Sequence, residues 1–196
     1  YIEANGHYAF VQDYIARGPY HLVQDSTTRD YTTIMHAEEE VKTAANINLG
    51  SVRVYGFSAQ SKWNILSTLA YHGSLTYARG LGNNMSGNLP SISPLFLSQK
   101  VQWQLPKGEL SLHWYHAQQK TPNSYSPWGE DGIEETPLLA NGTYAGTPAW
   151  HRWDVQFALP LSNTMNVSCG IFNLWNTHYR DCLLYTSPSP RDAIPS

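Results

Sequence analysis

The chain has 196 residues, of which 13% are aromatic and 14% charged, and its formal net charge is −3. The fraction of charged residues is about half the usual one, which excludes a disordered tail and a coiled coil. The net charge is negative, so no basic surface for binding nucleic acid is expected. No apolar run exceeds four residues, which excludes a transmembrane helix. The length suits one domain or a piece of a larger protein, and the start at Tyr1, without methionine, favours a piece.

Alternation of apolar and polar side chains predicts an all-β, antiparallel domain, because successive side chains of a strand point to opposite faces. Seven segments show this pattern: 8–17, 45–60, 69–77, 97–105, 110–115, 150–159 and 165–171. In the second segment the alternation changes phase at Gly50-Ser51, which predicts a β-bulge there. His113 and His116 are three residues apart and should therefore lie on opposite faces of their strand, where they cannot share a metal ion.

Short and long connections alternate between these strands. Segments 62–67, 106–108 and 161–164 are short, whereas 18–42, 80–94 and 119–149 are long and rich in Gly, Pro, Asn, Ser and Tyr. Short turns at one end and long loops at the other are typical of an outer-membrane β-barrel. The opposite strand face is filled with polar residues and should line the interior, including Lys100, Gln102, Arg152 and Asp154.

The aromatic residues fit two interfacial belts. Trp63 and Trp103 lie beside short turns, and five others are placed toward the long loops: Tyr77, Trp114, Trp150, Trp153 and Trp175. A soluble β-sandwich also alternates and also carries core tryptophans, so this alternative stays open. Seven strands cannot close around a lumen, and open edges are not tolerated in lipid, so a barrel reading requires further strands.

The last fifteen residues differ from the rest. The run from Cys182 to Asp192 resembles the translation of a transposase sequencing adapter, and its Ser-Pro repeats break both helix and strand. We therefore expect two regions: a natural β-domain over residues 1–181 and a non-native, disordered tail over residues 182–196.

Five motifs, in order along the chain, resemble the C-terminal barrel of a TonB-dependent outer-membrane receptor of the Bacteroidetes type. They are NLGSVRVYGF at 48–57, LPSISPL at 89–95, YSPWGEDGIEETP at 125–137, YAGTPAW at 144–150 and GIFNLWNTHY at 170–179. The resemblance implies a 22-stranded barrel of which about seven strands are present. It also implies that the plug, the TonB box and the final strand are missing from this chain.

By the same resemblance, the intact protein is located in the outer membrane with its long loops outside the cell, among outer-membrane lipid and lipopolysaccharide. It would take up a scarce, bulky nutrient (an iron–siderophore complex, haem, cobalamin or a glycan), energised by the TonB complex acting through the plug. No cofactor and no enzymatic activity are implied.

Candidate functional residues come from the long loops. Aromatic and imidazole side chains suited to holding a ligand are Tyr31, His36, Tyr125, Trp128 and Tyr144. An acidic cluster is a weaker candidate for Ca²⁺, formed by Glu130, Asp131, Glu134 and Glu135. No Gly-x-Ser-x-Gly, His-Glu-x-x-His or phosphate-binding glycine motif is present, so a catalytic site is not expected.

Two other functional classes stay open at this point. A passive porin or adhesin barrel would have no plug, which the upstream reading frame would reveal. A soluble β-sandwich carbohydrate-binding module would fold without detergent, whereas isolated barrel strands should aggregate through their unpaired edges.

Overall fold

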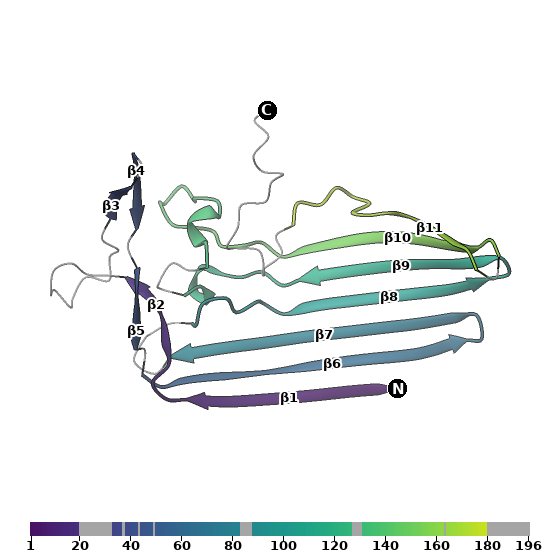
Figure 1. The fold of residues 1–196 in the computed structure, drawn as a ribbon, viewed down its shortest axis with the longest axis horizontal. Helices are drawn as coiled ribbons and strands as arrows, with labels where there is room; N and C mark the ends of the chain where they lie inside the picture. Colours follow the sequence, from purple (N-terminus) through teal and green to yellow (C-terminus); the bar gives the residue numbers. More distant parts are fainter. Residues whose placement is uncertain are drawn as a thin grey trace.

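The computed structural model describes residues 1–19, 33–36, 38–42, 44–48, 50–82, 88–126, 131–162 and 164–179. Seven of the described strands form one sheet with the order β1-β6-β7-β8-β9-β10-β11 (Figure 1). Every neighbouring pair is antiparallel, as predicted. The strands are β1 (Ile2–Val11), β6 (Val52–Leu66), β7 (Leu69–Gly82), β8 (Phe96–Leu105), β9 (Gly108–Ala117), β10 (Trp150–Pro160) and β11 (Asn166–Ile171).

Smaller elements gather at the end of the sheet where the long loops lie (Figure 1). Strand β2 (Ile15–Pro19) pairs with β5 (Ala44–Asn48), and β3 (Thr33–His36) pairs with β4 (Glu39–Lys42). Two short 3₁₀ helices, η1 (Pro122–Ser124) and η2 (Ile133–Glu135), lie in the connection between β9 and β10. No helix among the described residues is long and apolar enough to cross a membrane.

The predicted strand 8–17 is wrong in its bounds. The extended backbone is interrupted at Asp13, where φ is 53°, and this separates β1 from β2. The predicted strand 45–60 is likewise two strands in different sheets, β5 and β6. The phase change at Gly50 is a break rather than a bulge: Gly50 has a φ of 72°, its N–H donates to Asn48 Oδ1 at 2.7 Å, and its carbonyl accepts the N–H of Tyr14 at 2.9 Å. A positive φ favours glycine and ends the ladder. Similarly, residues 62–66 belong to β6, so the first short turn is only Ser67-Thr68.

The register separates the two faces of the sheet, because directly paired residues point to the same side. One row across six strands is wholly apolar: Trp63, Tyr71, Val101, Leu112, Val155 and Ile171. The adjacent row, on the opposite face, is wholly polar: Lys62, His72, Lys100, His113 and Asp154. We call these the apolar face and the polar face; the four residues predicted to line the interior all lie on the polar face, and His113 and His116 lie on opposite faces.

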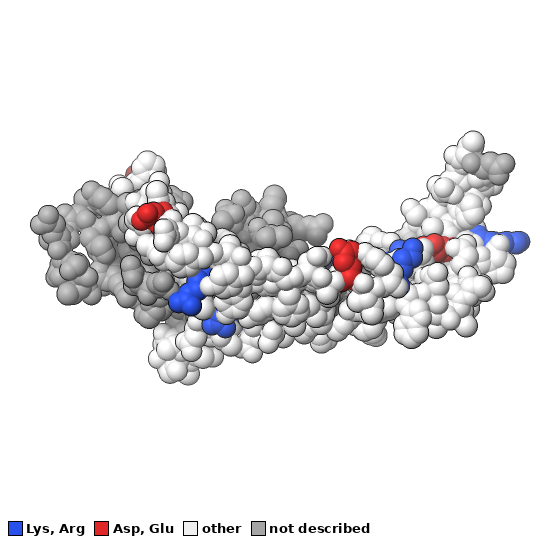
Figure 2. Space-filling model, turned by 90° about the horizontal axis from the view of Figure 1, so that it is seen from below, with Lys and Arg blue, Asp and Glu red and all other residues white. Residues whose placement is uncertain are grey.

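Nothing among the described residues packs against the apolar face as a second sheet would. Leu112 and Val167 remain 37% and 47% exposed, and the buried core is a small cluster around Val52 and Leu89 at the long-loop end. The part of the chain that the structure describes therefore does not form a two-sheet sandwich. Viewed from the β1 edge, the sheet is a slab with few charged side chains (Figure 2).

Five of the seven predicted belt residues lie on the apolar face: Trp63, Tyr77, Trp103, Trp114 and Trp153. Trp63 and Trp103 project from the apolar face near the turns and are 66% and 50% exposed. Trp114 and Trp153 pair on the same face toward the loops, with ring centroids 6.1 Å apart. The placement of Trp150 in this belt is wrong: it lies on the polar face, buried, against Phe96 and Tyr179, with centroids at 6.0 and 5.1 Å.

Candidate ligand-binding end of the barrel wall

The connection between β9 and β10 is held together by one carboxylate. Asp131, 3% exposed, accepts the Lys120 ammonium at 3.1 Å and the Ser126 N–H at 2.9 Å through Oδ2. Its Oδ1 accepts the N–H of Ser91 at 2.5 Å. Asp131 therefore ties the β9–β10 connection both to itself and to the segment that precedes β8.

A second feature of this connection is its tight backbone crossing. Lys120 and Thr147 form an antiparallel bridge with N···O distances of 2.9 and 3.0 Å. Gly146, which directly precedes Thr147, has a φ of 75°. A Cβ placed there would lie 2.3 Å from the carbonyl oxygen of Lys120. Only glycine fits this crossing, because a side chain would be both strained and sterically blocked.

Tyr125 packs inside the connection rather than presenting its ring to solvent. Its side chain is 4% exposed, and its hydroxyl makes a 2.6 Å hydrogen bond with Thr147 Oγ1. The Lys120 ammonium lies 4.6 Å from the centre of its ring, within cation–π range. This burial indicates that Tyr125 supports the loop from within.

Two other predicted ligand residues are accessible. His36 ends β3 and is exposed, paired in register with Glu39. Tyr144, 36% exposed, pairs with Leu138 in a small hairpin at the tip of the β9–β10 connection. Tyr31 and Trp128 lie outside the described residues. The structure does not bring His36 and Tyr144 together into one described pocket.

The predicted Ca²⁺ cluster is arranged differently from a cation site. Asp131 is already bound to the ammonium of Lys120, whereas Glu134 and Glu135 are exposed on η2. Glu130 lies outside the described residues, as does the expected tail at 182–196. Within the described ranges, no group of three or more His, Cys, Asp or Glu side chains is placed to hold a metal ion.

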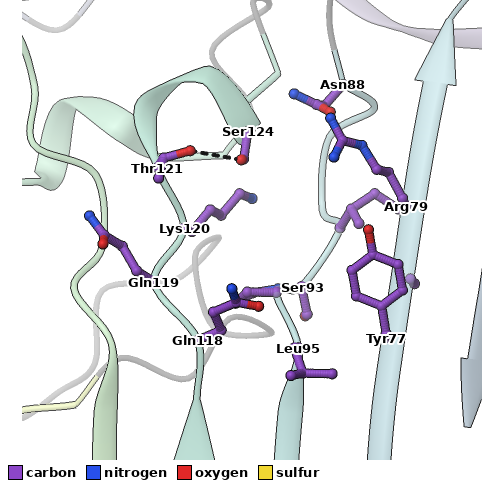
Figure 3. Close-up of a pocket in the computed structure, with 13 residues that line it drawn as sticks. Tyr77, Arg79, Asn88, Ser93, Leu95, Gln118, Gln119, Lys120, Thr121 and Ser124 are labelled. Carbon is purple, nitrogen blue, oxygen red and sulfur yellow. Dashed lines mark hydrogen bonds between the residues drawn. The ribbon is translucent and has the colours of Figure 1, made fainter.

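A pocket of about 340 Å³ opens where β7 and β8 part, beyond their last pair, Thr76 and Phe96. Its walls are the end of β7, residues 92–95 and residues 118–121 (Figure 3). Arg79 extends from β7 toward Asn88, and Lys120 reaches in from the opposite wall. Sequence reasoning missed this pocket, because it depends on where two strands separate.

A polar cluster on the polar face was recognised only in part from the sequence. Asp154, 2% exposed, accepts Arg152 at 2.9 Å and the N–H of Asn173 at 2.8 Å. Arg152 also donates to the Tyr179 hydroxyl at 2.9 Å and lies between the rings of Tyr115 and Tyr179. This cluster fixes the segment after β11 against the polar face. Its only sequence signal is the position of Arg152 and Asp154 on the polar side of their strand.

A single-layer antiparallel sheet with one apolar face, one polar face and long loops at one end is the wall of a transmembrane β-barrel. The profile of a protein family described as "TonB dependent receptor-like, beta-barrel" matches residues 2–174. The chain belongs to this family, and it is accordingly an outer-membrane protein.

Solved structures agree with this fold. The copper transporter OprC is similar with a TM-score of 0.66 and 16% identity, over 93% of this chain and 24% of that one. The FrpB iron transporter from Neisseria meningitidis (F3-3 variant) is similar with a TM-score of 0.54 and 14% identity, over 91% and 25% of the two chains. The chain thus spans about a quarter of either structure. A comparison with curated protein sequences gives no match.

Proposed function

We propose that this chain is part of the barrel of a receptor that takes up a scarce, bulky nutrient in a TonB-dependent manner. The observation that carries the proposal is the family match over residues 2–174, on a sheet whose two faces differ in polarity as a membrane wall requires. In the intact protein the polar face would surround a plug, and the TonB complex would act through that plug. The chain itself would have no enzymatic role.

The nutrient would be met first by the long-loop end. The β9–β10 connection has a rigid base around Asp131 and Lys120 and an exposed tip at Tyr144. We propose that Tyr144 and His36, together with Tyr31 and Trp128, contribute ligand contacts there, whereas Tyr125 acts by holding the loop. Aromatic surfaces with a few directed polar groups suit iron–siderophore complexes, haem, cobalamin and glycans alike.

Two similar solved structures suggest which nutrients to test first. One is named a copper transporter and the other an iron transporter. Metal complexes are therefore the first nutrients to test. Lipid and lipopolysaccharide would surround the apolar face, whose exposed tryptophans are of the kind enriched at membrane interfaces.

The test uses the intact gene that contains this chain. A deletion strain should lose growth on one limiting nutrient among iron–siderophore, haem, copper, cobalamin and glycan sources, and the intact gene should restore it. Restoration should fail in a strain without TonB. Growth that is restored equally well without TonB would contradict the proposal and favour a passive porin.

A further inference from the structure

Two arginines project from the apolar face at its long-loop end. Arg79 pairs with Tyr55 in register, and Arg53 pairs with Leu81, so both lie on the side that carries Trp63 and Leu112. Both are exposed. In the barrel wall this side points away from the interior, so neither arginine faces the path of a transported nutrient.

The surface next to these arginines changes from apolar to polar over a few residues. Toward the turns, Leu75 pairs with Leu97 on the same face. Tyr77 follows, with its ring 5.6 Å from that of Phe57. Arg79 comes next along β7. This order of leucine, tyrosine and arginine along one face matches the order of chemical groups in a membrane lipid. Acyl chains pack against leucines, aromatic rings lie at the membrane interface, and guanidinium groups bind phosphate.

The pocket where β7 and β8 part adjoins Arg79 and supplies further polar groups. Besides Arg79, it is lined by Ser93, Gln118 and Gln119, which suit the hydroxyl groups of a sugar. Two ion pairs join described residues, Lys120–Asp131 and Arg152–Asp154, and neither includes Arg79. The Lys120–Asp131 pair is neutral overall, so Arg79 gives the pocket its positive charge.

We propose that Arg79 and Arg53, with the pocket beside Arg79, bind the phosphorylated sugar headgroup of a lipid in the outer leaflet. The guanidinium groups would make charge-assisted, bidentate hydrogen bonds to phosphate. The pocket would take the adjoining sugar, and the acyl chains would lie along Leu75 and Leu97. The proposal rests on the location of the chain in the outer membrane and is independent of which nutrient is transported.

The test uses the intact receptor that contains this chain, purified in mild detergent and studied by native mass spectrometry and calorimetry with bisphosphorylated lipid A. The wild-type protein should bind it. The double substitution Arg53→Ala/Arg79→Ala should weaken binding roughly tenfold or more, since each lost bond is charge-assisted. Lys107→Ala, an exposed cation at a turn on the other end of the sheet, is the matched control and should bind as wild type does.

Three comparisons can overturn the proposal: no binding to the wild-type protein, equal binding of dephosphorylated lipid A, or an equal loss in the Lys107→Ala control. Displacement by millimolar inorganic phosphate would assign the site to free phosphate instead and would overturn it too. Heat-dependent mobility in SDS gels reports whether each variant forms a closed barrel. If the double variant does not form a closed barrel, Arg79→Lys replaces it in the test. Weaker binding of lipid A by this variant supports bidentate hydrogen bonds from the planar guanidinium group to phosphate. Binding with wild-type affinity contradicts the proposal.

Discussion

The buried Lys120–Asp131 pair offers the sharpest test of how the β9–β10 connection keeps its structure. Asp131→Ala would leave the Lys120 ammonium, itself only 4% exposed, without its counter-ion and the N–H groups of Ser91 and Ser126 without their acceptor. Removing one member of a buried pair costs about 3–5 kcal/mol. That cost falls on the local stability of the connection rather than on the sheet, because none of these groups belongs to a strand of the sheet.

Lys120→Met should cost less than Asp131→Ala. The carboxylate that remains still accepts two backbone N–H groups, whereas the ammonium that remains in the other variant keeps only the face of the Tyr125 ring. The double variant should be no less stable than Asp131→Ala alone, because the two side chains act as one unit. Glu134→Ala, an exposed acid in the same connection, is the control and should change stability by less than about 0.5 kcal/mol.

Hydrogen exchange of the intact receptor in detergent measures these effects. The amides of Lys120, Gly146 and Thr147 report on the base of the connection, since each donates a hydrogen bond within it. A loss of 3 kcal/mol corresponds to roughly hundredfold faster exchange. Exchange that is unchanged in Asp131→Ala, or that is equal in Glu134→Ala, would refute the role assigned to this pair.

Three further predictions concern other parts of the chain. Gly146→Ala should expose the β9–β10 connection to limited proteolysis, whereas Gly142→Ala, also at positive φ but with nothing within 4 Å of a Cβ, should have a much smaller effect. Val155→Arg should reduce assembly into the outer membrane, by about 2–4 kcal/mol if it lies near the bilayer midplane, whereas Gln156→Arg on the polar face should not; equal yields of the two would contradict the assignment of faces. Asp154→Ala should speed hydrogen exchange in residues 172–179, which it holds through the N–H of Asn173, and unchanged exchange there would argue against that role.

The sequence predicted what depends on local alternation. The two faces, the antiparallel order and the interior positions of Lys100 and Asp154 follow from a period of two, and the register confirms them. Strand bounds were less accessible, because Asp13 and Gly50 end strands through backbone angles that the side-chain pattern does not record. Trp150 was misplaced because its ring is buried by Phe96 and Tyr179, and such a contact has no signature in either segment alone.

The sequence assigned the candidate ligand residues to loops but could not give their contacts. Ligand binding among the long, aromatic-rich loops stays a prediction. The sequence did not indicate that Asp131 pairs with a lysine eleven residues away rather than with a cation from solution. The pocket beside Arg79 arises from the separation of two strands, and sequence periodicity carries no information about that separation.

The small hairpin between Leu138 and Tyr144 is carried on the base that Asp131 and Gly146 secure, and its turn at Asn141-Gly142 has open space around it. An epitope inserted between Asn141 and Gly142 should therefore be displayed on the surface of living cells without disturbing the rest of the receptor. The same site would accept a fluorophore or an affinity handle, which would allow single receptors to be tracked or isolated in their native membrane.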